Sequence, residues 1–141
     1  INGQLNLAKK HMEMGISLLE QYQLLYTNDS IPQINNYAVL LTEIQEPDLA
    51  LSALQKLAQI IKEYNSNHCL DYAQVQESLG SICLITANIS QAKTHFKKAL
   101  KIYEDIWADE PELIEEKYKK IQELYPQAGI ALAKSILPTK H

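Results

Sequence analysis

A repeat of 42 residues constrains the fold of this chain more than any other feature of its sequence. Ala8, Ala50 and Ala92 are separated by two equal steps of 42 residues. Apolar columns follow each alanine in the same register, at Met12, Leu54 and Phe96, at Gly15, Leu57 and Ala99, at Ile16, Ala58 and Leu100, at Leu18, Ile60 and Ile102, and at Leu19, Ile61 and Tyr103. Within each unit these positions lie on one stripe of an α-helix. We therefore predict a stack of helical repeats, in which each unit buries its apolar face against its neighbours.

A second set of apolar segments lies upstream of these helices and also recurs every 42 residues. Pro32, Pro47 and Pro111 stand close to the expected helix starts. Asn88 and Gln91 have the spacing of a capping box, in which each side chain pairs with a backbone N–H near the helix start. Strand patterns are absent. About seven helices are predicted, at 5–26, 31–45, 47–64, 69–87, 89–107, 111–125 and 127–137.

The charge balance excludes whole classes of partner. The chain carries 13 lysines, no arginine and 17 acidic residues, for a net charge of −4. A nucleic-acid-binding domain needs a basic face and usually arginine for base contacts, so no nucleic-acid partner is expected. No uncharged run reaches the roughly 20 residues of a membrane span, so we expect no membrane association. The two cysteines, Cys69 and Cys83, are consistent with a reducing, cytoplasmic location.

Motifs for catalysis and cofactor binding are absent from the sequence. The four glycines are scattered, so they form no phosphate-binding loop. The histidines lack metal-ligand spacing, and the serines lack the context of a nucleophile elbow. His68 and Cys69 are adjacent, but neighbouring residues on a helix point about 100° apart, which disfavours a reactive pair. We therefore expect no enzymatic activity, no cofactor and no bound metal.

A run of acidic residues is the most uneven feature of the charge distribution. Between Lys101 and Lys117 the chain has seven acids and no base, namely Glu104, Asp105, Asp109, Glu110, Glu112, Glu115 and Glu116. We call these seven residues the acidic patch. The simplest interpretation is an exposed connection whose negative charge suits the helix start at Pro111. The alternative is a docking patch for a basic partner.

The central repeat has the residue pattern of a known family. Leu79 and Gly80 are followed by small and aromatic residues at set spacings, and this run resembles the tetratricopeptide repeat. The signature residues assigned on this basis are Ala8, Ala50, Leu79, Gly80, Ala92, Phe96 and Ala99. Gly80 and Ala92 are expected to face each other where the paired helices cross, and Ala99 to let the next repeat stack. Cys83 departs from the family pattern, in which Tyr is usual.

The resemblance implies an all-α fold of helix-turn-helix repeats stacked in a right-handed superhelix. The usual period of the family is about 34 residues, so a longer period implies about one extra turn in each helix. Elongated repeats of this kind are similar to those of kinesin light chains, bacterial peptide-pheromone receptors and the C-terminal domains of MYND-type lysine methyltransferases. We expect one domain over 1–141, with the second helix of a truncated repeat at 1–28, repeats at 31–66 and 69–107, and a terminal helix pair at 111–137. Because the chain starts at Ile1, we expect it to be a fragment of a longer protein.

The resemblance also implies a concave groove, lined by the first helix of each repeat, in which the family usually binds peptides. If Gly80 is the eighth position of the family pattern, the groove residues are Asn35, Asn36, Val39, Thr42, Glu43, Gln74, Glu77, Ser78, Ser81, Leu84, Ile85, Lys119 and Glu123, with Pro32, Glu116 and Lys120 at further equivalent positions. The amides and hydroxyls suit hydrogen bonds to an extended peptide backbone. Glu43, Glu77 and Glu123 are expected to favour a basic ligand.

These observations predict a protein–protein interaction module, a scaffold or adaptor that binds a partner peptide or helix in the groove. The carboxylate clamp that recognises chaperone C-termini needs Lys and Asn where this chain has Val39, Glu77 and Ser81, so no such ligand is expected. Two alternatives stay open, a regulatory domain that covers or positions a catalytic domain elsewhere in the parent protein, and a peptide-sensing receptor domain. The choice between the groove and the acidic patch as docking site is open as well.

Overall fold

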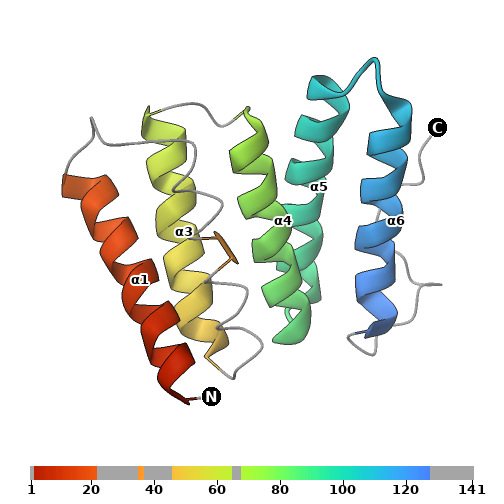
Figure 1. The fold of residues 1–141 in the computed structure, drawn as a ribbon. Helices are drawn as coiled ribbons and strands as arrows, with labels where there is room; N and C mark the ends of the chain where they lie inside the picture. The colour runs from red at the N-terminus through yellow and green to blue at the C-terminus, as the bar shows by residue number, and fades with distance from the viewer. Residues whose placement is uncertain (1, 22–34, 37–45, 65–67, 128–141) are drawn as a thin grey trace.

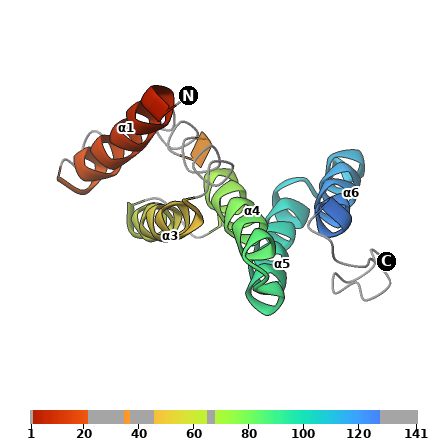
Figure 2. The same ribbon diagram turned by 90° about the horizontal axis from the view of Figure 1, so that it is seen from below.

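The computed structural model describes residues 2–21, 35–36, 46–64 and 68–127. Five helices are formed, α1 (Asn2–Gln21), α3 (Pro47–Tyr64), α4 (Leu70–Ile85), α5 (Ile89–Ile106) and α6 (Pro111–Gln127), and residues 35–36 are helical as well. The helices stand side by side in chain order (Figure 1). Figure 2 shows that this row is not flat and that the 35–36 segment lies next to α4. Over the described ranges the fold is all-helical, as the sequence predicts.

The helix bounds agree closely with the prediction where they are described. α3 begins and ends at the predicted residues, and α5 does so within one residue. α1 begins three residues earlier than predicted, and α6 continues two residues further, through Pro126 in its last turn. The predicted helix at 127–137, most of the one at 31–45 and residues 22–26 of the first lie outside the described residues.

The repeat columns form the core of the fold. Met12, Leu54 and Phe96 occupy one column, lie on three different helices and are each 0% exposed. The other described columns are equally buried on α3 and α5, at Leu57 and Ala99, Ala58 and Leu100, Ile60 and Ile102, and Ile61 and Tyr103. Ala50 and Ala92 are also fully buried, while the side chain of Ala8 lies outside the described ones. Equivalent positions of the repeat therefore occupy equivalent environments, as stacked units require.

α4 is the central helix of the described fold. It packs most extensively against α5 and next against α3. One apolar cluster joins α1, α3 and α4, and a second joins α4, α5 and α6. Because α4 contributes to both clusters, three of its polar residues, Gln76, Glu77 and Ser78, are buried. Buried polar groups need hydrogen-bond partners, so neighbouring helices have to supply them.

The turn between α4 and α5 ends α4 with a left-handed residue, Ala87, at φ 62°. The backbone N–H of Asn88 donates to the Cys83 carbonyl at 2.7 Å and so satisfies one of the last carbonyls of α4. The predicted capping box is wrong, because Asn88 Nδ2 donates instead to Gln91 Oε1 at 2.8 Å and no side chain caps the helix. The Asn88 backbone, at φ −98° and ψ 70°, lacks the extended geometry typical of a capping residue.

Gly80 packs against the ring of Phe96 of α5. The three atoms nearest to a Cβ at Gly80 all belong to the Phe96 ring. Ala92 is buried in the same apolar cluster as Phe96, one turn earlier on α5. The contact with Phe96 adds a partner that the sequence does not predict, and the expectation that Gly80 faces Ala92 stays a prediction. The need for a glycine at this close approach of α4 and α5 is confirmed.

Candidate functional site

A polar pocket of about 400 Å³ lies where the 35–36 segment, α4 and α6 meet. Its lining residues are Asn35, Asn36, Gln74, Glu77, Ser78, Lys117 and Lys120. The three residues from α4 are spaced at i, i+3 and i+4, and the two from α6 at i and i+3, so each set lies on one helix face. All of these elements are first helices of repeats in the predicted organisation. The pocket therefore lies on the surface where the resemblance places the groove.

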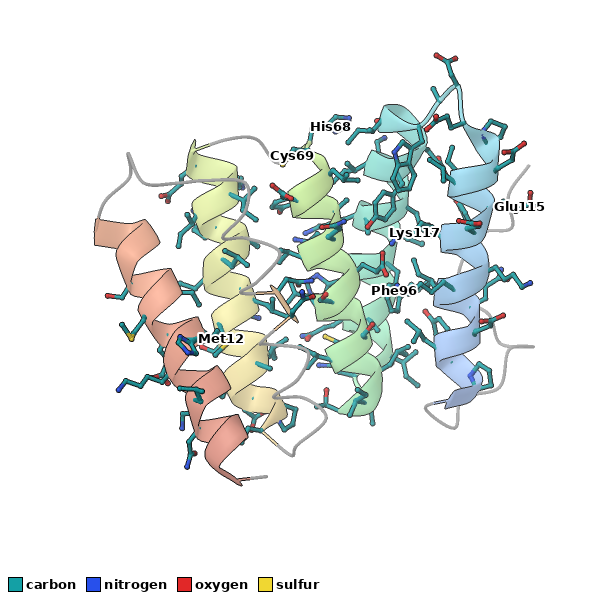
Figure 3. The ribbon with its side chains drawn as sticks, viewed as in Figure 1. Met12, His68, Cys69, Phe96, Glu115 and Lys117 are labelled. Atoms are coloured by element: carbon teal, nitrogen blue, oxygen red, sulfur yellow. The ribbon has the colours of Figure 1, made fainter. Side chains whose placement is uncertain are left out.

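Glu77 is the buried centre of this pocket wall, with a side chain only 11% exposed. Its Oε1 accepts hydrogen bonds from the Tyr103 hydroxyl and from Lys117 Nζ, both at 2.9 Å. Its Oε2 lies 3.4 Å from Lys120 Nζ. Figure 3 shows Lys117 extending from α6 toward α5. A buried carboxylate is costly unless it is paired, and donors from α5 and α6 provide the pairing here.

These contacts change the charge of the pocket. The sequence predicts that Glu77 attracts a basic ligand, but in the structure its carboxylate is already contacted by two lysines of the chain itself. One carboxylate and two ammonium groups give the described lining of the pocket one net positive charge. Burial, followed by the charge and hydrogen bond of Glu77, raises the pKa of Tyr103. The hydroxyl of Tyr103 therefore remains a donor to Glu77 over the physiological pH range.

Two lining groups are left only partly satisfied. The Lys120 side chain is 63% exposed against 21% for Lys117, and its contact with Glu77 is the longer one. Lys117 is held further by the ring of Tyr103, whose centroid lies 5.0 Å from its Nζ. Asn35 Oδ1 is buried and has no hydrogen-bond partner among the described residues. A ligand that brings an anionic group would satisfy Lys120, and the exposed amide of Asn36 in the same pocket can exchange hydrogen bonds with a peptide backbone.

The structure brings together only part of the expected groove. Five expected residues line the pocket, namely Asn35, Asn36, Gln74, Glu77 and Ser78. Ser81 is half-buried, and its hydroxyl donates to the Glu77 carbonyl at 3.2 Å. Leu84 is 3% exposed and belongs to the cluster between α4, α5 and α6, so the expectation of a groove contact is wrong there. Ile85 is exposed at the end of α4. Val39, Thr42 and Glu43 lie outside the described residues.

On α6 the pocket is lined by Lys117 and Lys120, and not by Lys119 or Glu123. Lys120 falls in an expected repeat column, but Lys117 does not, because the residue 42 positions earlier is the buried Val75. Lys119 and Glu123 are exposed on α6 outside the pocket. Lys119 is turned about 100° from Lys120 around the helix axis, which explains why one of two adjacent lysines points away. The only sequence signal for Lys117 is its i, i+3 spacing to Lys120.

Tyr103 is a second residue whose role the sequence pattern does not reveal. Its column otherwise contains Leu19 and Ile61, which predicts an apolar core position. The ring fulfils this prediction, because it is fully buried and stacks on Trp107 with centroids 4.7 Å apart. The hydroxyl goes beyond it by reaching Glu77. The one difference in the sequence is the hydroxyl itself, since a buried tyrosine usually finds a hydrogen-bond partner and its column otherwise holds aliphatic residues.

The acidic patch is exposed at all seven positions. Two of its members have partners, because the Tyr118 hydroxyl donates to Glu104 and His68 Nε2 lies 3.2 Å from Asp105 Oδ2. The other members follow the connection from α5 and the first turns of α6. The patch therefore has the exposure that a docking surface for a basic partner requires, and also that of a solvated connection.

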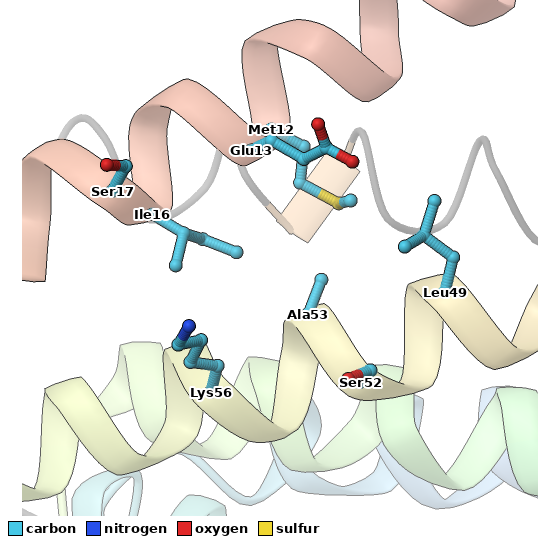
Figure 4. Close-up of a pocket in the computed structure, with 8 residues that line it drawn as sticks. All are labelled: Met12, Glu13, Ile16, Ser17, Leu49, Ser52, Ala53 and Lys56. Atoms are coloured by element: carbon cyan, nitrogen blue, oxygen red, sulfur yellow. The ribbon is translucent and has the colours of Figure 1, made fainter.

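A second pocket, of about 580 Å³, lies between α1 and α3 (Figure 4). Met12 and Ile16 from α1 and Ala53 from α3 form its apolar floor, and all three are buried. Glu13 and Lys56 are among its exposed lining residues. The sequence does not predict this pocket. It lies between the second helices of successive repeats, away from the polar pocket.

Across 2–21, 35–36, 46–64 and 68–127, no three His, Cys, Asp or Glu side chains are grouped so that they could hold a metal ion. None of the described helices combines the length and the apolar character needed to cross a bilayer.

The sequence profile of the tetratricopeptide repeat matches residues 30–105, just over half of the chain. The chain belongs to the tetratricopeptide repeat family. No curated protein and no solved structure matches it. Tetratricopeptide repeats generally mediate protein–protein interaction and are generally non-catalytic. The matched segment includes the 35–36 segment and α4, which form two of the three walls of the polar pocket.

Proposed function

We propose that this tetratricopeptide repeat domain is a non-catalytic scaffold or adaptor that holds an extended peptide segment of a partner protein in its groove. The polar pocket recognises one acidic side chain of that segment. The observation that carries the proposal is the exposed ammonium of Lys120 in the same pocket as the exposed amide of Asn36. An acidic residue in an extended peptide offers a carboxylate for the first and a backbone N–H or C=O for the second.

The charge of the pocket supports an acidic ligand group over a basic one. Lys117 and Lys120 outnumber Glu77, and a basic side chain entering here would meet both ammonium groups. One net positive charge suits one carboxylate. A chaperone C-terminus brings several carboxylates together, so we propose that it is not the ligand.

The remaining lining residues support recognition of a peptide backbone. Asn36, Gln74 and Ser78 offer both donors and acceptors around the pocket. Each hydrogen bond to such a group contributes about 0.5 to 1.5 kcal/mol, and more where a buried group would otherwise stay unpaired. The pocket would thus bind a short segment weakly, and a longer partner would gain affinity from contacts beyond it.

A second docking surface is supported by the exposure of the acidic patch. Its seven carboxylates suit a basic partner and would act separately from the pocket. The broader role of the domain, as a scaffold, as a regulatory domain beside a catalytic one, or as a peptide sensor, depends on what the domain is joined to. All three roles use the same peptide-holding pocket.

The test is an NMR titration of the ¹⁵N-labelled 141-residue chain with a capped pentapeptide that has one central glutamate among glycines. We expect shifts at Asn35, Asn36, Gln74 and Lys120 and a millimolar or tighter dissociation constant. Lys120→Ala should weaken binding by about tenfold, the scale of one charge-assisted hydrogen bond. Lys119→Ala is the matched control, because it removes the same charge from the next residue outside the pocket and should bind normally.

Three results would contradict the proposal. The first is equal binding of a peptide with central glutamine, and the second is equal weakening by Lys119→Ala and Lys120→Ala. The third is binding of a lysine-containing peptide that shifts only signals of the acidic patch. Such binding should disappear when Glu112, Glu115 and Glu116 are replaced by Lys. That last outcome would assign docking to the acidic patch in place of the pocket.

A further inference from the structure

We propose that Glu77 sets the charge of the ligand that the pocket accepts, as a built-in counter-ion that restrains binding of doubly charged groups. The inference rests on the proposed function, since it concerns the ligand of the same pocket. It assigns to Glu77 a role in specificity and not only in packing. The chemical class that it predicts for the ligand is a single carboxylate, in preference to a phosphate.

The geometry places Glu77 where a ligand anion would compete with it. Its two carboxylate oxygens contact both lysines of the pocket, Lys117 at 2.9 Å and Lys120 at 3.4 Å. An incoming anion has to share Lys120 with Glu77 or draw it away. Lys117 is less available, because it is more buried and is also held over the Tyr103 ring. The pocket therefore releases one ammonium group to a ligand and retains the other.

Glu77 is also held in place independently of the lysines. The Tyr103 hydroxyl donates to its Oε1, and the Glu77 side chain is nearly buried. When Lys120 turns toward a ligand, the carboxylate stays at the wall with Tyr103 and Lys117 as partners. Its negative charge thus continues to lower the potential that the ligand experiences.

The effect of this charge depends on the charge of the ligand. Coulomb energy is proportional to both charges, so a neighbouring carboxylate repels a dianion about twice as strongly as a monoanion. Phosphoserine carries a charge of about −1.5 to −2 near neutral pH, and a glutamate side chain carries −1. Removal of the Glu77 charge should therefore raise the affinity for phosphoserine more than the affinity for glutamate. A structural effect of the substitution would change both affinities by the same factor.

The experiment compares Glu77→Gln with the wild-type chain at pH 7.5. The probes are the capped glutamate pentapeptide and its phosphoserine counterpart, titrated by NMR. Glutamine keeps the size of the side chain and an oxygen that accepts from Tyr103 and Lys117. We expect the affinity for the glutamate peptide to rise by about threefold to tenfold. The gain for the phosphoserine peptide should approach the square of that factor, so a threefold gain would correspond to about ninefold.

Each outcome decides the inference. A larger gain for phosphoserine than for glutamate supports it. Equal gains, no change or weaker binding by Glu77→Gln overturn it, because Glu77 then only positions the lysines. If the wild-type chain binds the glutamate peptide as proposed, such a result removes this inference alone. If neither chain binds either peptide, the proposed acidic ligand fails and the inference fails with it.

Glu77→Gln leaves Lys117 without its carboxylate partner, and this could prevent folding. A second pair of variants tests the inference in that case. Lys117→Gln and the double variant with Glu77→Gln differ only in the Glu77 charge, and neither contains an unpaired Lys117. The double variant should bind both peptides more tightly than Lys117→Gln, again with the larger gain for phosphoserine. Thermal unfolding and circular dichroism of all variants identify any that do not fold. Equal affinities of this pair would overturn the inference.

Discussion

Gly80 of α4 lies directly against the ring of Phe96 of α5. A Cβ atom built on Gly80 would come within 2.5 Å of Phe96 Cε1 and within 2.8 Å of two further ring carbons. Such distances are far shorter than a carbon–carbon contact allows. The two residues therefore form one packing unit, and the closeness of α4 and α5 depends on the missing side chain.

Replacing Gly80 with Ala should destabilise the protein by about 1 to 3 kcal/mol, because the Phe96 ring leaves no space for a methyl group at this position. Helix propensity alone predicts the opposite sign, since Ala in a helix interior is favoured by about 0.5 to 1 kcal/mol over Gly. Gly3→Ala is the control, because no described atom lies within 4 Å of a Cβ there. Urea unfolding measures the unfolding free energy of both variants and of the wild type. A neutral or stabilising Gly80→Ala would refute this account of the helix crossing.

The same unit predicts a coupling between the two positions. Phe96→Leu alone should destabilise by leaving a cavity, but it also makes space beside position 80. In the Phe96→Leu background, Gly80→Ala should cost at least about 0.5 kcal/mol less than in the wild type. A double-mutant cycle of the unfolding free energies gives this difference, and simple additivity would contradict direct contact.

Tyr103→Phe should destabilise the protein by about 1.5 to 3 kcal/mol, the range for a hydrogen bond to a charged group. The phenyl ring keeps the stack on Trp107, so the loss isolates the hydroxyl that donates to Glu77. Tyr125→Phe is the matched control, because the Tyr125 hydroxyl is buried with no hydrogen-bond partner among the described residues. That change should be neutral or slightly stabilising. Equal costs for the two variants would argue against the Tyr103–Glu77 bond.

The sequence predicts the fold well because the repeat columns are apolar and their burial depends only on helix periodicity. Met12, Leu54 and Phe96 show this, since a single offset places all three in the core. The polar site is less predictable. Its key contact, Lys117 with Glu77, joins residues 40 positions apart on different helices. Periodicity indicates which face a residue occupies, but not which charges from another helix meet it there.

Leu84 and Asn88 show two further limits of prediction from the sequence. A family position predicts Leu84 in the groove, but α6 packs over that face of α4 and buries it. The spacing of Asn88 and Gln91 predicts a capping box, but capping also depends on backbone angles that spacing does not encode. Both errors arise where tertiary packing or local backbone geometry decides the outcome.

Tyr118 should make the stability of the protein depend on pH in the alkaline range. Burial, with the hydrogen bond and charge of Glu104, raises the pKa of Tyr118 to about 12. An unfolded tyrosine titrates near about 10, so the folded state favours the protonated form. The stabilisation is therefore complete below pH of about 10 and is lost as the pH rises toward 12. Tyr118→Phe should be less stable than wild type at pH 8, and this difference should shrink by pH 11 in urea unfolding. A constant difference would contradict the titration of Tyr118.

His95 should make the stability of the protein depend on pH in the acidic range, with the opposite sign to Tyr118. Burial, and then the charge of Lys98, lowers the pKa of His95, so the folded state favours the neutral ring. In that form Nδ1–H donates to Oε1 of the buried Gln76, the pair being 2.7 Å apart. The resulting stability is present above the ordinary histidine pKa of about 6.5 and is lost as the pH falls. His95→Asn keeps an N–H donor without a titrating ring, so its melting temperature should fall less between pH 8 and pH 5 than that of the wild type.

The effect of Lys98 on the pKa of His95 can be tested separately from a general loss of stability in acid. Lys98→Gln removes the second cause of the lowered pKa, so the His95 ring should titrate at a higher pH in an NMR titration of its carbon-bound protons. Lys97→Gln, the same change on the preceding exposed residue, should shift the His95 titration less, because the charge that lowers the pKa of His95 is that of Lys98. If both variants shift it equally, distant surface charge and not the neighbouring ammonium sets the pKa. If neither variant shifts the titration, burial between α4 and α5 is sufficient to keep the His95 ring neutral.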